Sequence, residues 1–181
     1  MSRFVIAQPE KCIGCRTCEV ACVLAHSLDA GDATLSPANF KPRLKLVKTA
    51  SVTAPVQCRQ CENASCVSAC PTQALVYERG TVQLVAERCI GCQTCVMACP
   101  FGAMEMTSTS VVSAPLGALR VRTHVMQAHK CDLCEATADG PACVRVCPTK
   151  ALFLIDQEGV LTTGDERRTQ AVGRMPHIGL R

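Results

Sequence analysis

The chain has no tryptophan, one tyrosine and four phenylalanines among 181 residues, so aromatic side chains contribute little to its core. Its hydrophobic fraction of 48% counts cysteine, and without cysteine the fraction falls to roughly 39%, below the ~45–50% of ordinary domains. No segment approaches the ~18 consecutive apolar residues of a membrane-spanning helix. These shortages argue against a large conventional core and against a membrane span.

Several functional signatures are missing as well. The sequence has no phosphate-binding loop, no G-x-G-x-x-G fingerprint and no nucleophile–base pair, so we expect no catalytic residues. The N-terminal apolar run spans only Phe4 to Ala7, which is too short for a signal peptide, and no twin arginine lies near the start. We therefore expect a cytoplasmic protein, in a reducing compartment where thiolates persist.

Cysteine, in contrast, is abundant and regularly spaced. All sixteen cysteines fall into four groups of four, and groups one and three share the spacing C-x2-C-x2-C-x3-C. Three groups end in Cys-Pro, at Pro71, Pro100 and Pro148. This pattern is the ligand signature of bacterial-type 4Fe–4S clusters, in which the fourth cysteine serves the other cluster of a pair. The groups are, in order, Cys12, Cys15, Cys18 and Cys22; Cys58, Cys61, Cys66 and Cys70; Cys89, Cys92, Cys95 and Cys99; Cys131, Cys134, Cys143 and Cys147.

Two other uses of cysteine fit the sequence less well. Disulfide scaffolds are typically secreted and shorter than about 80 residues. Zinc ribbons pair two C-x2-C knuckles and do not require the third and fourth cysteines of this spacing. With all sixteen thiolates in quartets, none of the four histidines is needed as a ligand. The pattern predicts four 4Fe–4S clusters whose iron is held by cysteine alone.

The clusters also change the charge balance. Lysine and arginine exceed aspartate and glutamate, which gives a formal charge of +4. Each oxidised cluster with its four thiolates adds about −2, so four of them bring the formal charge to about −4. A surface for nucleic acid is therefore not indicated. The cations beside the ligands can offset cluster charge and raise cluster potentials; they are Arg16, Arg59, Arg88 and Lys130.

An internal duplication accounts for the four groups. C-I-G-C-R-T-C-E-V-A-C at 12–22 and C-I-G-C-Q-T-C-V-M-A-C at 89–99 are identical at eight of eleven positions. C-V-S-A-C-P-T-Q-A-L at 66–75 matches C-V-R-V-C-P-T-K-A-L at 143–152, and both matches are offset by 77 residues. Such self-similarity indicates two copies of one unit, 12–75 and 89–152.

The link between groups two and three suggests how the groups pair. The 18 residues between Cys70 and Cys89 predict a short β-hairpin, which suits the link between the two motifs of a small ferredoxin. Groups two and three then form one pair, and groups one and four the other. If each fourth cysteine crosses to its partner, four ligand sets follow. Set one is Cys12, Cys15, Cys18 and Cys147; set two is Cys58, Cys61, Cys66 and Cys99; set three is Cys89, Cys92, Cys95 and Cys70; set four is Cys131, Cys134, Cys143 and Cys22.

The predicted fold class is α+β, with two bacterial-ferredoxin-like modules for two 4Fe–4S clusters each, related by pseudo-two-fold symmetry. We expect short strands and helices and many loops, with helices at Thr17–His26 and Thr94–Ala98. A turn at Gln157–Gly159 is expected to lead into a strand at Val160–Thr162. The predicted divisions are 1–26 plus 121–156 for the first module (groups one and four), 53–106 for the second (groups two and three), 27–52 and 107–120 as insertions, and 157–181 as a C-terminal tail.

The motifs resemble those of a known family. R-F-V-I-A, K-C-I-G-C-R-T-C-E-V-A-C, R-C-I-G-C-Q-T-C-V-M-A-C-P-F-G-A and K-C-D-L-C are similar to the four-cluster ferredoxin-type electron-transfer subunits associated with formate dehydrogenase H and formate hydrogenlyase. The resemblance covers roughly Ser2 to Asp156, and all sixteen ligands match. The same motif occurs in β-subunits of dimethyl-sulfoxide-reductase-type enzymes. Cys22 is followed by Val23 rather than proline, so that turn is built differently.

The resemblance implies a non-catalytic electron-transfer component of an oxidoreductase complex. It implies a partner of the formate dehydrogenase type with a molybdenum or tungsten pterin, and an acceptor that is a hydrogenase or another iron–sulfur protein. Three alternatives remain open at this point: a maturation or assembly factor for such an enzyme, a self-associating electron conduit, and a β-subunit of another dimethyl-sulfoxide-reductase-type oxidoreductase.

Overall fold

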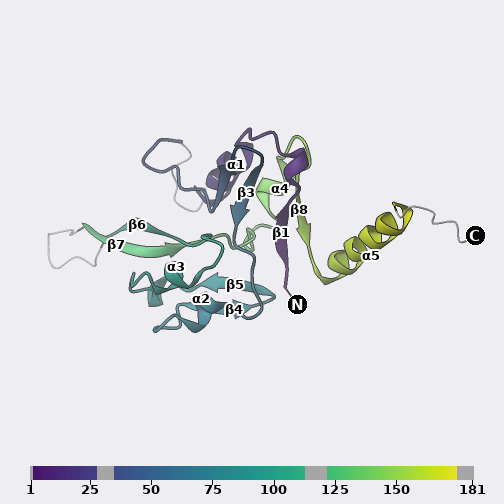
Figure 1. Ribbon diagram of the computed structural model, residues 1–181. Coiled ribbons are helices and arrows are strands. Elements are labelled where there is room, and N and C mark those ends of the chain that lie inside the picture. The colour runs from purple at the N-terminus through teal and green to yellow at the C-terminus, as the bar shows by residue number, and fades with distance from the viewer. Residues whose placement is uncertain (1, 28–34, 113–121, 175–181) are drawn as a thin grey trace, which may run out of the picture.

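The computed structural model describes residues 2–27, 35–112 and 122–174, which include all sixteen cysteines. Two small lobes make up most of the molecule, and a long hairpin and a helix extend from them (Figure 1). The strands are β1 (Phe4–Ala7), β2 (Leu44–Lys48), β3 (Thr53–Gln57), β4 (Leu75–Glu78), β5 (Thr81–Leu84), β6 (Glu105–Val112), β7 (Arg122–His129) and β8 (Leu152–Ile155). The helices are α1 (Thr17–Ser27), α2 (Ser65–Ser68), α3 (Thr94–Ala98), α4 (Ala142–Arg145) and α5 (Gln157–Gly173), with 3-10 turns at Pro9–Lys11 and Ala86–Arg88.

The first and last strands of the chain pair with each other, and this pairing has an equivalent within the chain. Residues 4–7 of β1 run antiparallel to residues 155–152 of β8. Residues 81–84 of β5 run antiparallel to residues 78–75 of β4. The 77-residue offset of the duplication converts one register into the other. The predicted hairpin between groups two and three is confirmed, and the two ends of the chain build its counterpart.

Each lobe has a small core in which cysteines occupy positions that large apolar side chains would otherwise fill. Val5 and Val82, which the duplication makes equivalent, are each only 1% exposed, one in each core. Cys58 packs against the first core, whereas Cys61 and Cys66 of the same group pack against the second. The two lobes therefore meet at group two. The first core contains Val5, Cys18, Cys22, Leu44, Cys131, Leu133, Cys143 and Leu152; the second contains Ala64, Leu75, Val82, Cys95, Met104 and Ala128.

Two further hairpins come from the regions between the motifs. β2 pairs with β3, and β3 ends directly before Cys58. β6 pairs with β7, and β7 ends two residues before Cys131. The long β6–β7 hairpin packs against the second core through Met106 and Ala128 and extends beyond it to one side of the molecule (Figure 1). Each predicted insertion thus contributes one strand of a hairpin, β2 or most of β6, and each hairpin leads into the first cysteine of a group.

The segment after Asp156 is helical, so the predicted strand at Val160–Thr162 is wrong. The Asp156 carboxylate accepts a hydrogen bond of 2.8 Å from the backbone N–H of Gly159, which is the usual N-cap contact that starts a helix. α5 runs on to Gly173 and projects from the lobe that holds β1 and β8 (Figure 1). In the part of the chain that the structure describes, no helix combines the length and the apolar character needed to cross a bilayer.

Candidate metal centres

Within group one and within group three, the loops between the first three cysteines have matching backbone conformations. Gly14 and Gly91 have φ angles of 72° and 71°, in the left-handed region that favours glycine. A Cβ atom at Gly91 would lie 2.7 Å from the backbone oxygen of Met126, so no larger residue fits there without movement. Arg16 and Gln93 are left-handed as well, with φ angles of 61° and 65°. These tight turns place three thiols within seven residues along the wall of one pocket.

Two pockets bring together cysteines that lie far apart in the sequence. One pocket is lined by Cys12, Cys15, Cys18 and Cys147. A second is lined by Cys89, Cys92, Cys95 and Cys70. Their other walls are equivalent too, with Ile13, Thr149 and Leu152 in the first and Ile90, Thr72 and Leu75 in the second. The cysteines in each pocket are those of set one and set three.

The two pockets contain the same hydrogen bonds to sulfur. The Thr17 hydroxyl donates to Cys15 Sγ at 3.3 Å, and the Thr94 hydroxyl donates to Cys92 Sγ at 3.4 Å. These bonds from threonine lower the pKa of Cys15 and the pKa of Cys92. Donors that favour the thiolate are what a metal-binding cysteine needs.

The crossing cysteines receive backbone donors. The N–H of Ala151 donates to Cys147 Sγ, and that of Ala74 donates to Cys70 Sγ, both at 3.2 Å. Burial raises the pKa of each of these thiols, but the hydrogen bonds outweigh it and the pKa is lowered. Set one and set three each include one exposed cysteine, Cys15 or Cys92. We call these two sets the outer sets.

The cysteines of set four lie close together in the interior of the first lobe. All four are buried. Burial, followed by the charges of Cys131, Cys22 and Cys134, raises the pKa of Cys143. Burial also raises the pKa of Cys131 to about 12 and that of Cys22 to about 11. Buried thiols held this close favour a site in which a metal cation replaces the protons.

The cysteines of set two are half-buried and also lie near one another. Burial, with the charges of Cys58 and Cys99, raises the pKa of Cys66 to about 11. Cys99 thus lies near group two although it belongs to group three. Set two and set four contain no exposed cysteine, and we call them the inner sets.

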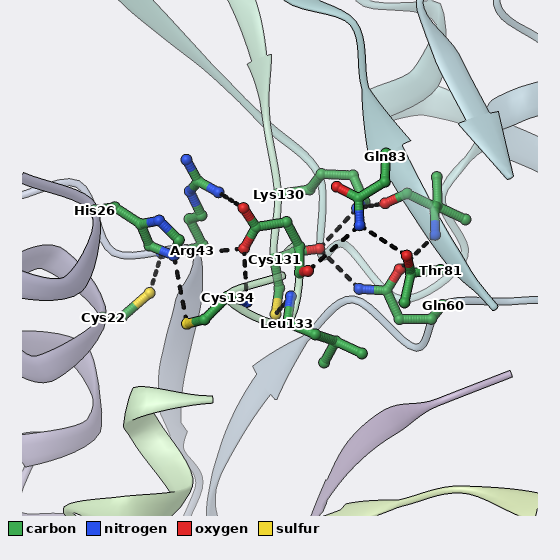
Figure 2. Close-up of polar contacts among 12 residues, drawn as sticks. Cys22, His26, Arg43, Gln60, Thr81, Gln83, Lys130, Cys131, Leu133 and Cys134 are labelled. Carbon is green, nitrogen blue, oxygen red and sulfur yellow. Dashed lines mark hydrogen bonds and ion pairs between the residues drawn. The ribbon is translucent and has the colours of Figure 1, made fainter. Parts of the chain in front are cut away.

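A polar network surrounds set four (Figure 2). The backbone N–H of Arg43 donates to Cys22 Sγ at 3.3 Å, and the Arg43 side chain pairs with Asp132. His26 Nε2 lies 3.7 Å from Cys134 Sγ and 3.4 Å from Asp132 Oδ1. Burial raises the pKa of Asp132, but Arg43 and His26 outweigh it and the pKa is lowered.

Sequence reasoning missed Arg43, Asp132 and the role of His26, because these residues come from three separate segments. His26 lies beside a cysteine sulfur, although the four cysteine quartets require no histidine as a ligand. Of these three residues, only Asp132 could have been identified from the sequence, because it stands between two cysteines of group four.

The chemistry of the donors fits iron–sulfur clusters. All sixteen cysteines are free thiols. Two sets line pockets, and hydrogen-bond donors that favour thiolate reach sulfur in each outer set. Cysteine thiolates with such donors are the normal ligands of 4Fe–4S clusters.

Known protein families match the same cysteine-rich regions. Residues 57–103 and 88–151 match one family described as 4Fe-4S dicluster domain, and residues 11–75 match another with the same description.

Three relatives match over most of their length. Electron transport protein HydN of Escherichia coli strain K12 is 46% identical over 168 residues, which cover 93% of this chain and 96% of HydN. Putative electron transport protein YsaA of the same strain is 46% identical over 160 residues, covering 88% of this chain and 94% of YsaA. An iron-sulfur protein of Rhodospirillum rubrum is 40% identical over 178 residues, covering 94% of this chain and 91% of that protein.

The family matches and the relatives agree with the arrangement of the sixteen thiols. The chain belongs to the 4Fe-4S dicluster-domain family of electron transport proteins, and it carries four 4Fe–4S clusters.

Proposed function

We propose that the protein relays single electrons between a formate dehydrogenase-type catalytic subunit with a molybdenum or tungsten pterin and a hydrogenase or another iron–sulfur acceptor. Its four clusters would be held by set one, set two, set three and set four, as the crossover rule assigns them. When bound, a 4Fe–4S cluster accepts and releases one electron at a time. The chain itself supplies spacing, hydrogen bonds and charge, and no catalytic group.

The ligand assignment depends mainly on which cysteines line the two outer pockets. Each is lined by three cysteines of one motif and by a fourth from a remote motif, Cys147 or Cys70. The equal register of the β1–β8 and β4–β5 pairs supports two modules related by a pseudo-two-fold axis. In this scheme residues 1–26 with 121–156 form one module, and residues 53–106 form the other.

The arrangement of the sets supports a linear relay. Set one and set four share the first core, and Cys58 of set two packs against that same core. Set three and the rest of set two belong to the second core. The proposed order is set one, set four, set two, set three, because the amide of Gln60, which stands between Cys58 and Cys61, donates to the backbone oxygen of Cys131. Exposed isoleucines, Ile13 and Ile90, lie at the two outer pockets, where partner proteins would approach.

The choice of formate as the upstream reaction comes from the resemblance of the motifs to formate dehydrogenase-associated subunits. A cytoplasmic location is part of the same proposal. Potentials in the lower half of the roughly −700 to +450 mV range of iron–sulfur clusters are expected for this couple. A redox titration with all four clusters well above zero would reject it.

The ligand assignment is tested by two matched substitutions. Cys147→Ser should disturb the set-one cluster alone, and the equivalent Cys70→Ser should disturb the set-three cluster alone, each read by electron paramagnetic resonance. Loss of a set-two signal in Cys147→Ser would refute the crossover.

The partner is tested by anaerobic purification with a tag on this chain. A stable complex with a pterin-dependent enzyme supports the proposal, whereas binding only to an enzyme that lacks its cofactor supports a maturation factor. Recovery of the chain only as a self-associated oligomer supports the conduit.

A further inference from the structure

A lysine is buried at the meeting point of the two lobes. Lys130 is only 4% exposed. Its ammonium donates to the backbone oxygen of Val82 and, at 2.7 Å, to that of Cys131 (Figure 2). Within the described residues it forms no ion pair with a carboxylate. A buried cation without an anionic partner is costly, so its charge calls for compensation by another group.

The duplication supplies a neutral counterpart of this lysine. Gln57 directly precedes the first cysteine of group two, as Lys130 precedes that of group four. Gln57 is 3% exposed and donates to the backbone oxygen of Val5 at 2.8 Å. Val5 and Val82 are equivalent positions of the repeat. The two halves thus make the same contact, once with a cation and once with an amide.

Lys130 lies between the inner sets. It directly precedes Cys131 of set four, and its ammonium donates to the same Cys131 oxygen as the amide of Gln60, which stands between Cys58 and Cys61 of set two. Gln60, which is completely buried, contacts the same two residues as the ammonium, Cys131 and Val82. Its amide donates to the Cys131 oxygen and its oxygen accepts from the Val82 N–H, both at 2.8 Å. The ammonium is thereby fixed in position between two cysteine sets.

We propose that Lys130 is a fixed positive charge shared by the two inner clusters, and that it raises the reduction potential of both relative to the outer clusters. The proposal rests on the ligand sets given above. Reduction adds one negative charge to a cluster, and a nearby cation in a site of low polarity stabilises that charge. In the same way, the anionic clusters compensate the buried ammonium. Electrons would then be held preferentially in the middle of the relay.

The test replaces two cations by the residues at their equivalent positions. Lys130→Gln installs the residue found at position 57, which keeps an amide donor for the Val82 oxygen. The matched control is Arg16→Gln, which installs the residue at position 93; the Arg16 side chain is 68% exposed and lies beside set one. Both proteins are purified anaerobically with their clusters and titrated by electron paramagnetic resonance. A soluble paramagnetic lanthanide chelate, which relaxes exposed clusters more strongly, assigns signals to outer or inner sets.

Lys130→Gln should make both inner clusters about tenfold harder to reduce, which corresponds to about 59 mV for one electron. Arg16→Gln should leave the two inner midpoint potentials unchanged, because solvent screens an exposed charge. Unchanged inner potentials in an iron-complete Lys130→Gln protein, or a shift confined to an outer cluster, would overturn the proposal.

A Lys130→Gln protein that loses iron is also informative, because Lys130→Arg keeps the charge. Full iron in the arginine variant together with loss in the glutamine variant supports a requirement for the charge. Loss of iron in both overturns it in favour of a packing role. Iron and sulfide analysis of the unchanged protein separates the two hypotheses: fewer than four clusters there would contradict the proposed function, whereas four clusters with no response to Lys130→Gln would contradict only this inference.

Discussion

The outer sets and the inner sets differ in how closely the two halves of the molecule agree. Set one and set three match residue by residue, with one exposed and one buried cysteine each and equivalent threonine donors to sulfur. Set four is fully buried, whereas set two is half-buried. Beside them, Lys130 stands where the other half has Gln57. The duplication has left the outer sets alike and made the inner sets asymmetric.

The difference has a simple structural cause. The neighbours of the outer sulfurs come from the motifs themselves, since Thr17 and Thr94 each stand two residues after the cysteine that they contact. Two neighbours of the set-four sulfurs come from outside the motifs: His26 from α1, and Arg43 from the position directly before β2. α1 has 11 residues and its counterpart α3 has 5, so only the first lobe brings a residue such as His26 to the inner site.

The largest contrast is expected from removing one ligand of each kind. Cys131→Ala deletes a thiol of the first core, whereas Cys15→Ala deletes an exposed one. Both should lose iron from one site. Only Cys131→Ala should also destabilise the lobe, by more than about 3 kcal/mol, because metal binding and burial both contribute to folding there. Iron analysis and urea unfolding under anaerobic conditions measure the two effects.

Equal losses of stability in the two variants would contradict this contrast, since they would mean that the buried set contributes no more to the core than the exposed one. Cys92→Ala, the equivalent of Cys15→Ala in the second lobe, serves as the matched control and should behave like Cys15→Ala.

A smaller loss of stability is expected at acid pH from the protonation of His129, the last residue of β7. Burial, and then the charge of Arg43, lowers the pKa of His129 to about 4. The unfolded chain binds this proton near pH 6.5 and the folded chain does not. Stability should therefore be complete above pH 6.5 and fall as the pH drops towards 4. The full shift corresponds to about 3 kcal/mol, and because the ring is only partly buried, solvent screening reduces the expected loss to about 1–2 kcal/mol. Urea midpoints across this range should show the fall, and His129→Gln should remove it. The same slope in the variant would assign the effect to other groups.

The motifs predicted what local spacing determines. The β4–β5 hairpin and the helix at Thr94–Ala98 follow from residues that are close in the sequence, and the structure confirms both. The assignment of the sixteen cysteines as ligands follows from the same local spacing and stays a prediction. The surroundings of set four could not be predicted, because Arg43 and Asp132 are 89 residues apart and meet only in the folded chain.

Two features of the structure could have been predicted from residues visible in the sequence: the asymmetric site at Lys130 and the helix after Asp156. The position directly before Cys58 and Cys131 holds Gln57 in one half and Lys130 in the other, and comparing the halves there identifies the asymmetric site. The helix after Asp156 was missed because Gly159 suggested a turn, although an aspartate three residues before that N–H is a common helix start.

The smallest effect should come from the outer sulfurs, where the two halves are expected to respond alike. Thr17→Val removes the hydroxyl that donates to Cys15 Sγ, and Thr94→Val removes its counterpart at Cys92 Sγ. Valine keeps the shape of the side chain, so the main loss is one hydrogen bond to sulfur. Hydrogen bonds to sulfur raise the potential of a cluster. Each variant should therefore lower one outer potential by less than about 59 mV, a tenfold change in the reduction equilibrium.

The two threonine variants control each other in the same redox titration. Thr17→Val should move only the signal of set one, and Thr94→Val only that of set three, by similar amounts. A shift of an inner potential, or a clearly larger shift in one half, would show that the outer sites are less alike than their hydrogen bonds suggest. Equal small shifts would restrict the asymmetry between the halves to the inner sets, where Lys130 has a neutral counterpart, Gln57, rather than a second cation.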